Sequence, residues 1–130
     1  IEILSENKVH LEITNLIIPG LNDKKKKFKE MISMLAEIDK NIVLHISRYF
    51  PAYKSDIHSA KKSEMLQLFD IAKEKLHYVY LGNMLSEKGQ NTYCPVCNTK
   101  VVSRTKYYTQ MSGIRNHACN NCDYPIPIIY

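Results

Sequence analysis

Three apolar segments rich in β-branched residues alternate with two amphipathic segments along the first part of the chain. The apolar segments are residues 9–18, 42–50 and 77–81. This composition predicts three strands. The first ends in the continuous apolar run Leu16-Ile17-Ile18, which favours a strand buried on both faces. The residues before it read as the approach to that strand.

Between the predicted strands, apolar residues recur at the spacing of a helix with one buried stripe. The two stripes are Phe28, Met31, Ile32, Leu35 and Ile38, and Met65, Leu68, Phe69, Ala72 and Leu76. Asn22-Asp23 offers an N-cap to the first helix. Lysines 24–27 then occupy the positive end of the helix dipole, which is mildly unfavourable. We interpret them as a solvated helix start rather than a binding patch.

The order strand–helix–strand–helix–strand predicts parallel pairing through right-handed crossovers, an α/β arrangement. Three strands with helices on one side form an incomplete unit whose first and last strands are open edges. We therefore predict that residues 1–91 are the C-terminal portion of a parallel (β/α) barrel or half-barrel. The polar segment 86–91 reads as a linker to a second domain, residues 92–130.

All four cysteines lie in this second domain, as two Cys-x-x-Cys pairs separated by 21 residues. They are Cys94, Cys97, Cys119 and Cys122. Each pair brings two sulfurs to one ion from a tight turn, and two pairs complete a tetrahedron. Two disulfides or four reduced core thiols are the alternatives. Zinc suits four thiolates, and iron is chemically compatible as a single ion or a cluster. We predict a small β-rich zinc ribbon whose metal contributes much of the folding free energy.

The formal charge of +5 and the pI of about 9.0 raise the question of nucleic acid. Residues 1–91 hold 14 Lys+Arg against 12 Asp+Glu, and residues 92–130 hold 4 against 1, so the halves carry +2 and +3. Because neither half is strongly basic, we do not expect nucleic acid as the natural ligand. Arg104, Lys106 and Arg115, interleaved with Tyr107 and Tyr108, could contact a single strand but are equally ordinary on an exposed hairpin.

Neither a signal peptide nor an apolar run of about 18 residues is present, so we expect a cytoplasmic protein with no membrane partner. The first residue is Ile1 rather than Met, and we favour the hypothesis that the chain is a fragment.

Several segments together resemble the later part of a radical S-adenosylmethionine enzyme. They are Leu16-Ile17-Ile18-Pro19-Gly20-Leu21-Asn22-Asp23, His45-Ile46-Ser47-Arg48-Tyr49-Phe50-Pro51, Tyr80-Leu81-Gly82-Asn83, and the closing pairs of cysteines. The combination is most similar to the radical enzyme of the AmmeMemoRadiSam system, which is related to the pyruvate formate-lyase activating enzymes. The resemblance covers residues 9–130.

The resemblance implies an oxidoreductase in which a [4Fe–4S] cluster cleaves S-adenosylmethionine to a 5′-deoxyadenosyl radical. The family's Cys-x-x-x-Cys-x-x-Cys cluster loop is absent from this chain, so we expect this segment alone to be inactive and assign no catalytic residue. By position, Thr14 and Leu16 match residues that line the S-adenosylmethionine pocket in relatives, and His45 lies in a strand that also faces it. Judged from the sequence alone, His45 is either ligand-facing or a satisfied core histidine.

Two further expectations concern partners and the ribbon. The resemblance implies a protein substrate or other members of the AmmeMemoRadiSam system as partners. Two other hypotheses stay open, namely a stand-alone zinc-ribbon module that binds nucleic acid or a protein, and an auxiliary iron–sulfur cluster at the four cysteines.

Overall fold

A computed structural model describes residues 1–128, and the chain divides into two compact units at Ser86 and Glu87. This division lies within the polar segment 86–91, a few residues before the boundary predicted from composition. The last two residues of the predicted ribbon, 129 and 130, lie outside the described residues. Within residues 1–128, the helices are too short or too polar to cross a membrane.

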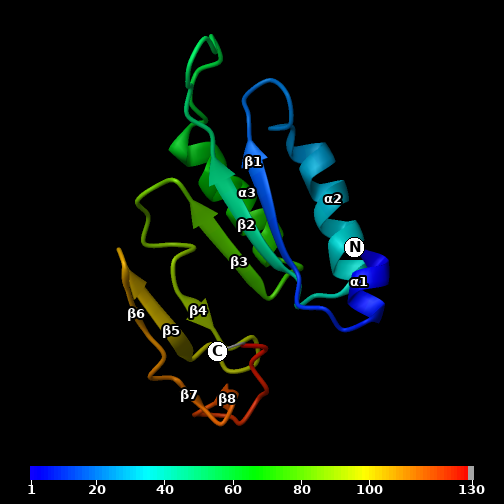
Figure 1. The fold of residues 1–130 in the computed structure, drawn as a ribbon, viewed down its shortest axis with the longest axis vertical. Coiled ribbons are helices and arrows are strands. Elements are labelled where there is room, and N and C mark those ends of the chain that lie inside the picture. The colour runs from blue at the N-terminus through cyan, green and yellow to red at the C-terminus, as the bar shows by residue number, and fades with distance from the viewer. Residues whose placement is uncertain (129–130) are drawn as a thin grey trace. The chain divides into compact units, whose positions relative to one another are not determined.

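The first unit contains a three-stranded parallel sheet with the strand order β1-β2-β3. Its strands are β1 (Glu12–Ile17), β2 (Val43–Arg48) and β3 (Tyr78–Gly82). The connecting helices α2 (Lys25–Ile38) and α3 (Lys62–Lys73) lie on the same face of the sheet, and a short helix α1 (Glu2–Glu6) precedes β1 (Figure 1). The predicted order of elements and the parallel pairing are therefore confirmed.

One face of the sheet and the inner faces of both helices make the core of this unit. Alternate strand residues point toward the helices, and they are Ile17, Leu44, Ile46, Val79 and Leu81. They pack against Phe28, Ile32 and Leu35 of α2 and against Met65, Leu68 and Ala72 of α3. These helix residues belong to the apolar stripes that the sequence shows, so the periodicity correctly identified the buried faces.

Strand β1 is not buried on both faces, contrary to the prediction from its apolar run. Its residues alternate between exposed and partly buried positions as far as Ile17. The strand starts at Glu12, and the chain opens with the short helix α1 at Glu2–Glu6 instead of an approach to a strand. The apolar run Leu16-Ile17-Ile18 does not lie wholly within the strand. The strand ends at Ile17, and Ile18 already belongs to the following turn.

The predicted N-cap of α2 is also wrong. The N-cap residue is Lys24, and no side chain caps this helix end. Asn22 and Asp23 serve the preceding turn, because the Asn22 Oδ1 accepts a hydrogen bond from the Ile18 amide at 2.7 Å and the Asp23 carboxylate accepts one from Gly20 at 3.0 Å. Asn and Asp side chains commonly stabilise turns in this way, and here the turn competes with the helix for them.

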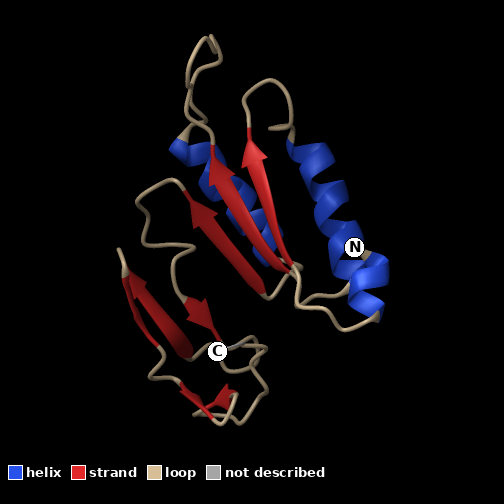
Figure 2. Ribbon diagram, in the orientation of Figure 1, coloured by secondary structure: helices blue, strands red, loops and turns tan. Residues whose placement is uncertain are grey.

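The second unit is small and β-rich (Figure 2). Its antiparallel strands β4 (Thr92–Tyr93), β5 (Lys100–Thr105) and β6 (Tyr108–Gln110) form one sheet, and β7 (Ile114–Arg115) and β8 (Ala118–Cys119) form a hairpin. The core consists of Val101, Val102 and Ile126 together with Cys94 and Cys119. So few apolar residues make a weak core, which agrees with a need for a further cross-link.

Candidate metal centre

The four cysteines of the second unit come together at one point. Their Sγ atoms all lie within 4.8 Å of one another, and the pairs Cys94–Cys122 and Cys97–Cys119 are each 3.5 Å apart. A disulfide would place two sulfurs at about 2.05 Å, so the cysteines are free thiols. A tetrahedral zinc ion with Zn–S bonds of about 2.3 Å separates its sulfurs by about 3.8 Å. The arrangement can therefore hold a metal ion such as zinc.

The two Cys-x-x-Cys turns repeat the same backbone hydrogen bonds. In the first turn, the Cys94 amide donates to Thr99 O at 2.8 Å and the Asn98 amide donates to Cys94 O at 2.9 Å. The equivalent bonds of the second turn run from Cys119 to Tyr124 and from Asp123 to Cys119, both at 2.9 Å. The centre is thus built from two copies of one local structure.

The residue after each second cysteine has a left-handed backbone, with φ of 57° at Asn98 and 56° at Asp123. Asn and Asp tolerate this conformation better than other residues with a side chain. It turns the next amide back toward the sulfur, so that Thr99 N–H bonds to Cys97 Sγ and Tyr124 N–H bonds to Cys122 Sγ. Such bonds stabilise a thiolate and fix its orientation toward an ion.

The thiols differ in how easily they lose a proton. Hydrogen bonds from the Thr99 hydroxyl, the Asn121 side chain and the Thr99 amide lower the pKa of Cys97 to about 5. The Tyr124 amide also favours the thiolate of Cys122, but burial and the other sulfurs outweigh it and raise that pKa to about 12. Four adjacent thiolates repel one another, so full ionisation needs a bound cation.

Four thiolates leave no ligand position open for water or substrate, which is typical of a structural metal site. Cys94 and Cys119 are buried, and Cys97 and Cys122 are partly exposed. His117, which lies two residues before Cys119, is exposed and does not belong to the group. The ion would therefore hold the two turns together rather than present a reactive site.

A second group of polar residues lies on the face of the parallel sheet that is opposite α2 and α3. The strand register aligns nine residues there in three rows: Glu12, Val43 and Tyr78; Thr14, His45 and Tyr80; and Leu16, Ser47 and Gly82. All three residues that resemble S-adenosylmethionine contacts, Thr14, Leu16 and His45, occupy this helix-free face. We call it the open face.

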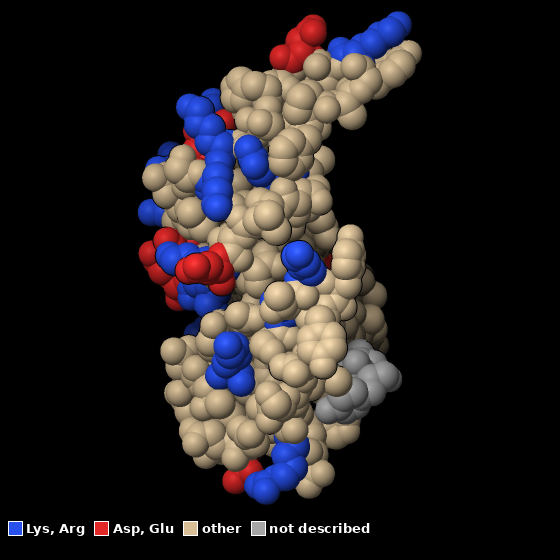
Figure 3. Space-filling view, turned by 90° about the vertical axis from the view of Figure 1, so that its left-hand side faces the viewer, with Lys and Arg blue, Asp and Glu red and all other residues tan. Residues whose placement is uncertain are grey.

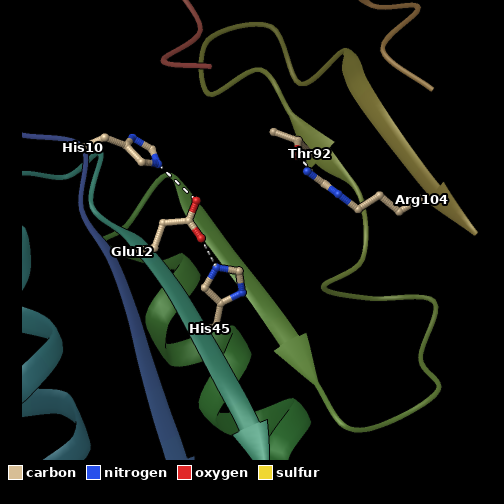
Figure 4. Close-up of polar contacts among 5 residues, drawn as sticks. All are labelled: His10, Glu12, His45, Thr92 and Arg104. Atoms are coloured by element: carbon tan, nitrogen blue, oxygen red, sulfur yellow. Dashed lines mark hydrogen bonds and ion pairs between the residues drawn. The ribbon is translucent and has the colours of Figure 1, made fainter. Parts of the chain in front are cut away.

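The Glu12 carboxylate holds two imidazoles at this face (Figure 4). One oxygen accepts a hydrogen bond from His10 Nε2 at 3.1 Å, and the other accepts one from His45 Nε2 at 2.9 Å. These two bonds hold the pKa of Glu12 below its usual value. The His45 ring also stacks on Tyr80, with 5.4 Å between the ring centroids. The His45 side chain is 36% exposed and hydrogen-bonded to Glu12, so it is partly buried at the open face rather than a core histidine.

Sequence reasoning missed Glu12 and His10 as partners of His45. The alternation His10-x-Glu12-x-Thr14 was a usable signal, because it places three polar residues on one face of β1. Each imidazole bonds to a different carboxylate oxygen. Within residues 1–128, the four cysteines are the one group of three or more His, Cys, Asp or Glu side chains whose ligand atoms are close enough together for one ion.

The basic residues of the ribbon differ in what they contact. The Arg104 guanidinium donates to Gln90 O at 3.2 Å and to the Thr92 hydroxyl at 2.9 Å, so it holds the start of the unit in place (Figure 4). Arg115 lies 4.0 Å from the Asp123 carboxylate. Lys106, Tyr107 and Tyr108 remain exposed at the tip of the β5–β6 hairpin.

Comparisons with known proteins give one informative match. The uncharacterized protein MJ0808 of Methanocaldococcus jannaschii is 30% identical to this chain over 126 residues, which are 93% of this chain and 38% of that protein. The chain therefore spans well under half the length of that relative. No family model and no solved structure match the chain.

Proposed function

We propose that this chain is the C-terminal part of a radical S-adenosylmethionine enzyme similar to the pyruvate formate-lyase activating enzymes. The observation that carries the proposal is the direction of winding. The strand order β1-β2-β3 follows the chain, and both crossover helices cover the same face. A (β/α) barrel continues to wind in this one direction. One half of a doubly wound sheet does so too, and the resemblance of the quoted segments favours the barrel.

In a barrel of this kind the open face would line the interior. Thr14, Leu16 and His45 lie together on that face, as the resemblance requires of residues near S-adenosylmethionine. Glu12 holds the His45 ring in one orientation through its Nε2. Because the carboxylate accepts at Nε2, this bond leaves the other ring nitrogen, Nδ1, free of Glu12.

The chain's own residues do not fit the [4Fe–4S] cluster of the family. That cluster would supply the electron that cleaves S-adenosylmethionine, and it needs three cysteines at a spacing that this sequence lacks. All four cysteines are committed to the two repeated turns of the ribbon. We therefore assign cluster binding to a different segment or chain and no catalytic step to these residues. A protein substrate or another AmmeMemoRadiSam component as partner remains part of the proposal.

For the ribbon we propose structural zinc. The closed set of four thiolates and the two preorganised turns support it. Elemental analysis and the visible spectrum of the purified protein separate zinc from iron, because thiolate-bound iron is coloured. One colourless zinc per chain supports the proposal, and iron with visible absorption would replace it with an auxiliary iron centre.

A chimera tests the enzymatic proposal directly. The chain replaces the matching segment of the longer Methanocaldococcus jannaschii relative, and the product is reconstituted anaerobically with iron, sulfide and a reductant. We expect 5′-deoxyadenosine release by the chimera and none by the chain alone. Thr14→Trp should abolish release by filling the open face, whereas Thr105→Trp, an exposed position of the ribbon, should leave it unchanged.

Two results would contradict the proposal. The first is a full-length relative that takes up no iron–sulfur cluster and releases no 5′-deoxyadenosine. The second is robust release by this chain alone, because its residues cannot hold the cluster.

The alternative of a ribbon that binds nucleic acid by itself has less support. Arg104 is engaged within its own unit, and a zinc ion with four thiolates carries a charge of −2 that offsets most of the ribbon's positive charge. If the ribbon bound single-stranded nucleic acid through its exposed hairpin tip, removal of Lys106 and Tyr107 should weaken that binding. Binding that persisted without these two residues would contradict a role of the tip.

A further inference from the structure

The charge of the first unit is unevenly distributed. Residues 1–86 hold 13 Lys+Arg against 11 Asp+Glu, a net charge of only +2. In a parallel sheet, the turns after the strands and the first halves of the following helices lie at one edge. These are residues 18–31, 48–67 and 83–86, and we call them the carboxyl edge. They hold 9 Lys+Arg against 4 Asp+Glu, or +5, and the rest of the unit has 4 against 7, or −3.

The lysines of the carboxyl edge are exposed, and most have no partner. Lys24, Lys25, Lys26 and Lys27 are exposed and make no side-chain hydrogen bond or ion pair within the described part of the chain. Figure 3, which faces the left-hand side of Figure 1, shows Lys and Arg side chains below the loop that projects at the top, with Asp and Glu side chains among them. The expectation against nucleic acid came from the net charges of residues 1–91 and 92–130. Those net charges do not show that positive and negative residues are separated within the first unit.

The positions of these lysines oppose helix stability. The first turn of α2 has no acidic residue, and its N-cap is itself a lysine. Helix α3 also begins at two lysines, Lys61 and Lys62, of which Lys61 lies 3.9 Å from the Glu64 carboxylate. Positive charge at the positive end of a helix dipole is unfavourable. Helix α3 has the acidic residue Glu64 in its first turn, so the rule is broken clearly at α2. A local rule that the sequence breaks in this way points to a function of that edge.

The loop 49–61 between β2 and α3 lies at the same edge (Figure 1). It holds exposed aromatic residues. The Tyr53 side chain is 95% exposed and Phe50 is 50% exposed. Tyr53 also has a left-handed backbone with φ of 55°, an uncommon conformation for a bulky residue. Lys54 Nζ lies 5.4 Å from the Tyr53 ring centroid.

The loop keeps a defined shape although its tip is exposed. Arg48 Nε donates to Ala60 O at 2.6 Å, and the Ala60 amide donates to Tyr49 O at 3.2 Å, so the two ends of the loop are joined. The Tyr49 hydroxyl lies 2.5 Å from Ser55 Oγ. A loop that is closed in this way presents its aromatic tip without a large further entropy cost on binding.

We propose that the carboxyl edge of the first unit binds single-stranded nucleic acid. Unpaired lysines neutralise phosphates, and exposed aromatic rings stack on unpaired bases. Protein interfaces are depleted in lysine, whereas nucleic-acid interfaces are strongly positive, so the lysines favour a polynucleotide over an acidic protein. This proposal goes beyond the enzymatic one and does not require it, because binding is measured without S-adenosylmethionine.

The test is fluorescence anisotropy of the zinc-loaded chain with labelled twelve-residue oligouridylate and oligothymidylate. Salt is varied between about 50 and 200 mM, because phosphate contacts make affinity fall steeply with salt. The variant Lys26→Glu/Lys54→Glu changes the carboxyl edge. The control Lys8→Glu/Lys40→Glu makes the same change of net charge at exposed positions elsewhere in the same unit.

We expect the edge variant to weaken binding at least about tenfold and to reduce the salt slope by about 1.4, the value for two lost contacts to a single strand. The control should change binding by less than about threefold. Tyr53→Ala should weaken binding at least about fivefold, and Tyr107→Ala, an equally exposed tyrosine of the ribbon, should not.

Two outcomes overturn the proposal. Equal losses in the edge variant and the control would mean that only net charge matters. Displacement of the oligonucleotide by poly-L-glutamate of the same charge and at the same concentration would assign the edge to acidic proteins instead. Either failure leaves the chimera experiment unaffected, so the two proposals can fail separately.

Discussion

Gly113 is the position where the ribbon tolerates no side chain at all. A Cβ built there would lie 2.5 Å from Lys100 O and 2.5 Å from Val101 Cα, both backbone atoms of β5. Ordinary contact begins at 3.4 Å, so the two backbones would have to separate by roughly 0.9 Å. Strand β5 cannot move easily, because it pairs with β4 on one side and β6 on the other.

The magnitude for Gly113→Ala follows from that contact. Overpacking against a fixed backbone costs about 1–3 kcal/mol. Separation also weakens two hydrogen bonds, from the Gly113 amide to Val101 O at 3.2 Å and from the Asn120 amide to Gly113 O at 3.0 Å, each worth about 1 kcal/mol. We therefore expect a loss of about 2–4 kcal/mol in the folding of the second unit.

Metal binding reports this loss, because folding of the ribbon and ion binding are coupled. Since about 1.4 kcal/mol is a factor of ten, zinc affinity should fall about 30- to 700-fold in competition with a chromogenic chelator. Gly20→Ala is the control, because its Cβ meets nothing within 4 Å and only its φ of +80° is strained. That variant should lower the stability of the first unit by about 1 kcal/mol and leave zinc affinity unchanged. If Gly113→Ala bound zinc as tightly as the wild type, the inferred close approach of Gly113 to the backbone of β5 would be wrong.

Three further predictions test other parts of the structure. Cys94→Ser should abolish stoichiometric zinc binding and the protection of unit 2 amides in hydrogen exchange while the helical circular dichroism of unit 1 persists; a full zinc equivalent in the variant would contradict the four-thiolate centre. Leu44→Ala should lower the free energy of unfolding of unit 1 by about 2–5 kcal/mol, because Leu44 is fully buried, whereas Leu85→Ala, 87% exposed, should change it by less than about 0.5 kcal/mol in urea titrations. Glu12 has a lowered pKa, so its stabilising contribution is present above the ordinary carboxyl pKa of about 4.5 and is lost as pH falls through the lower folded value. Glu12→Gln should therefore flatten the acid limb of the stability profile, and an unchanged limb would mean that the bonds to His10 and His45 do not persist in solution.

The elements of the first unit were predictable because their signals are local. The stripe containing Phe28 and Leu35 and the apolar segments of the three strands each follow from a few neighbouring residues. Errors arose where two local uses of one residue compete. Asn22 and Asp23 can cap a helix or close a turn, and only the folded chain shows that the turn uses them.

The candidate sites divide in the same way. The metal centre followed from cysteine spacing, since each turn is a local structure that closes over four residues. The bond between Glu12 and His45 joins two strands, and it depends on a register that pairs Thr14 with His45. A single sequence contains no local signal for that register. The same limit applies to Gly113, whose close approach to Val101 is set by the path of the chain across β5.

The two repeated turns of the metal centre also determine where the ribbon can change. Each turn carries its own hydrogen bonds, so neither depends on the length of the segment between Cys97 and Cys119. That segment has one fixed point, the crossing at Gly113, and one free end, the tip at Lys106 and Tyr107. Residues inserted at the tip would lengthen the hairpin without moving a sulfur. The ribbon therefore combines a metal site of constant geometry with a β5–β6 hairpin of variable length, and natural variants should differ in the hairpin.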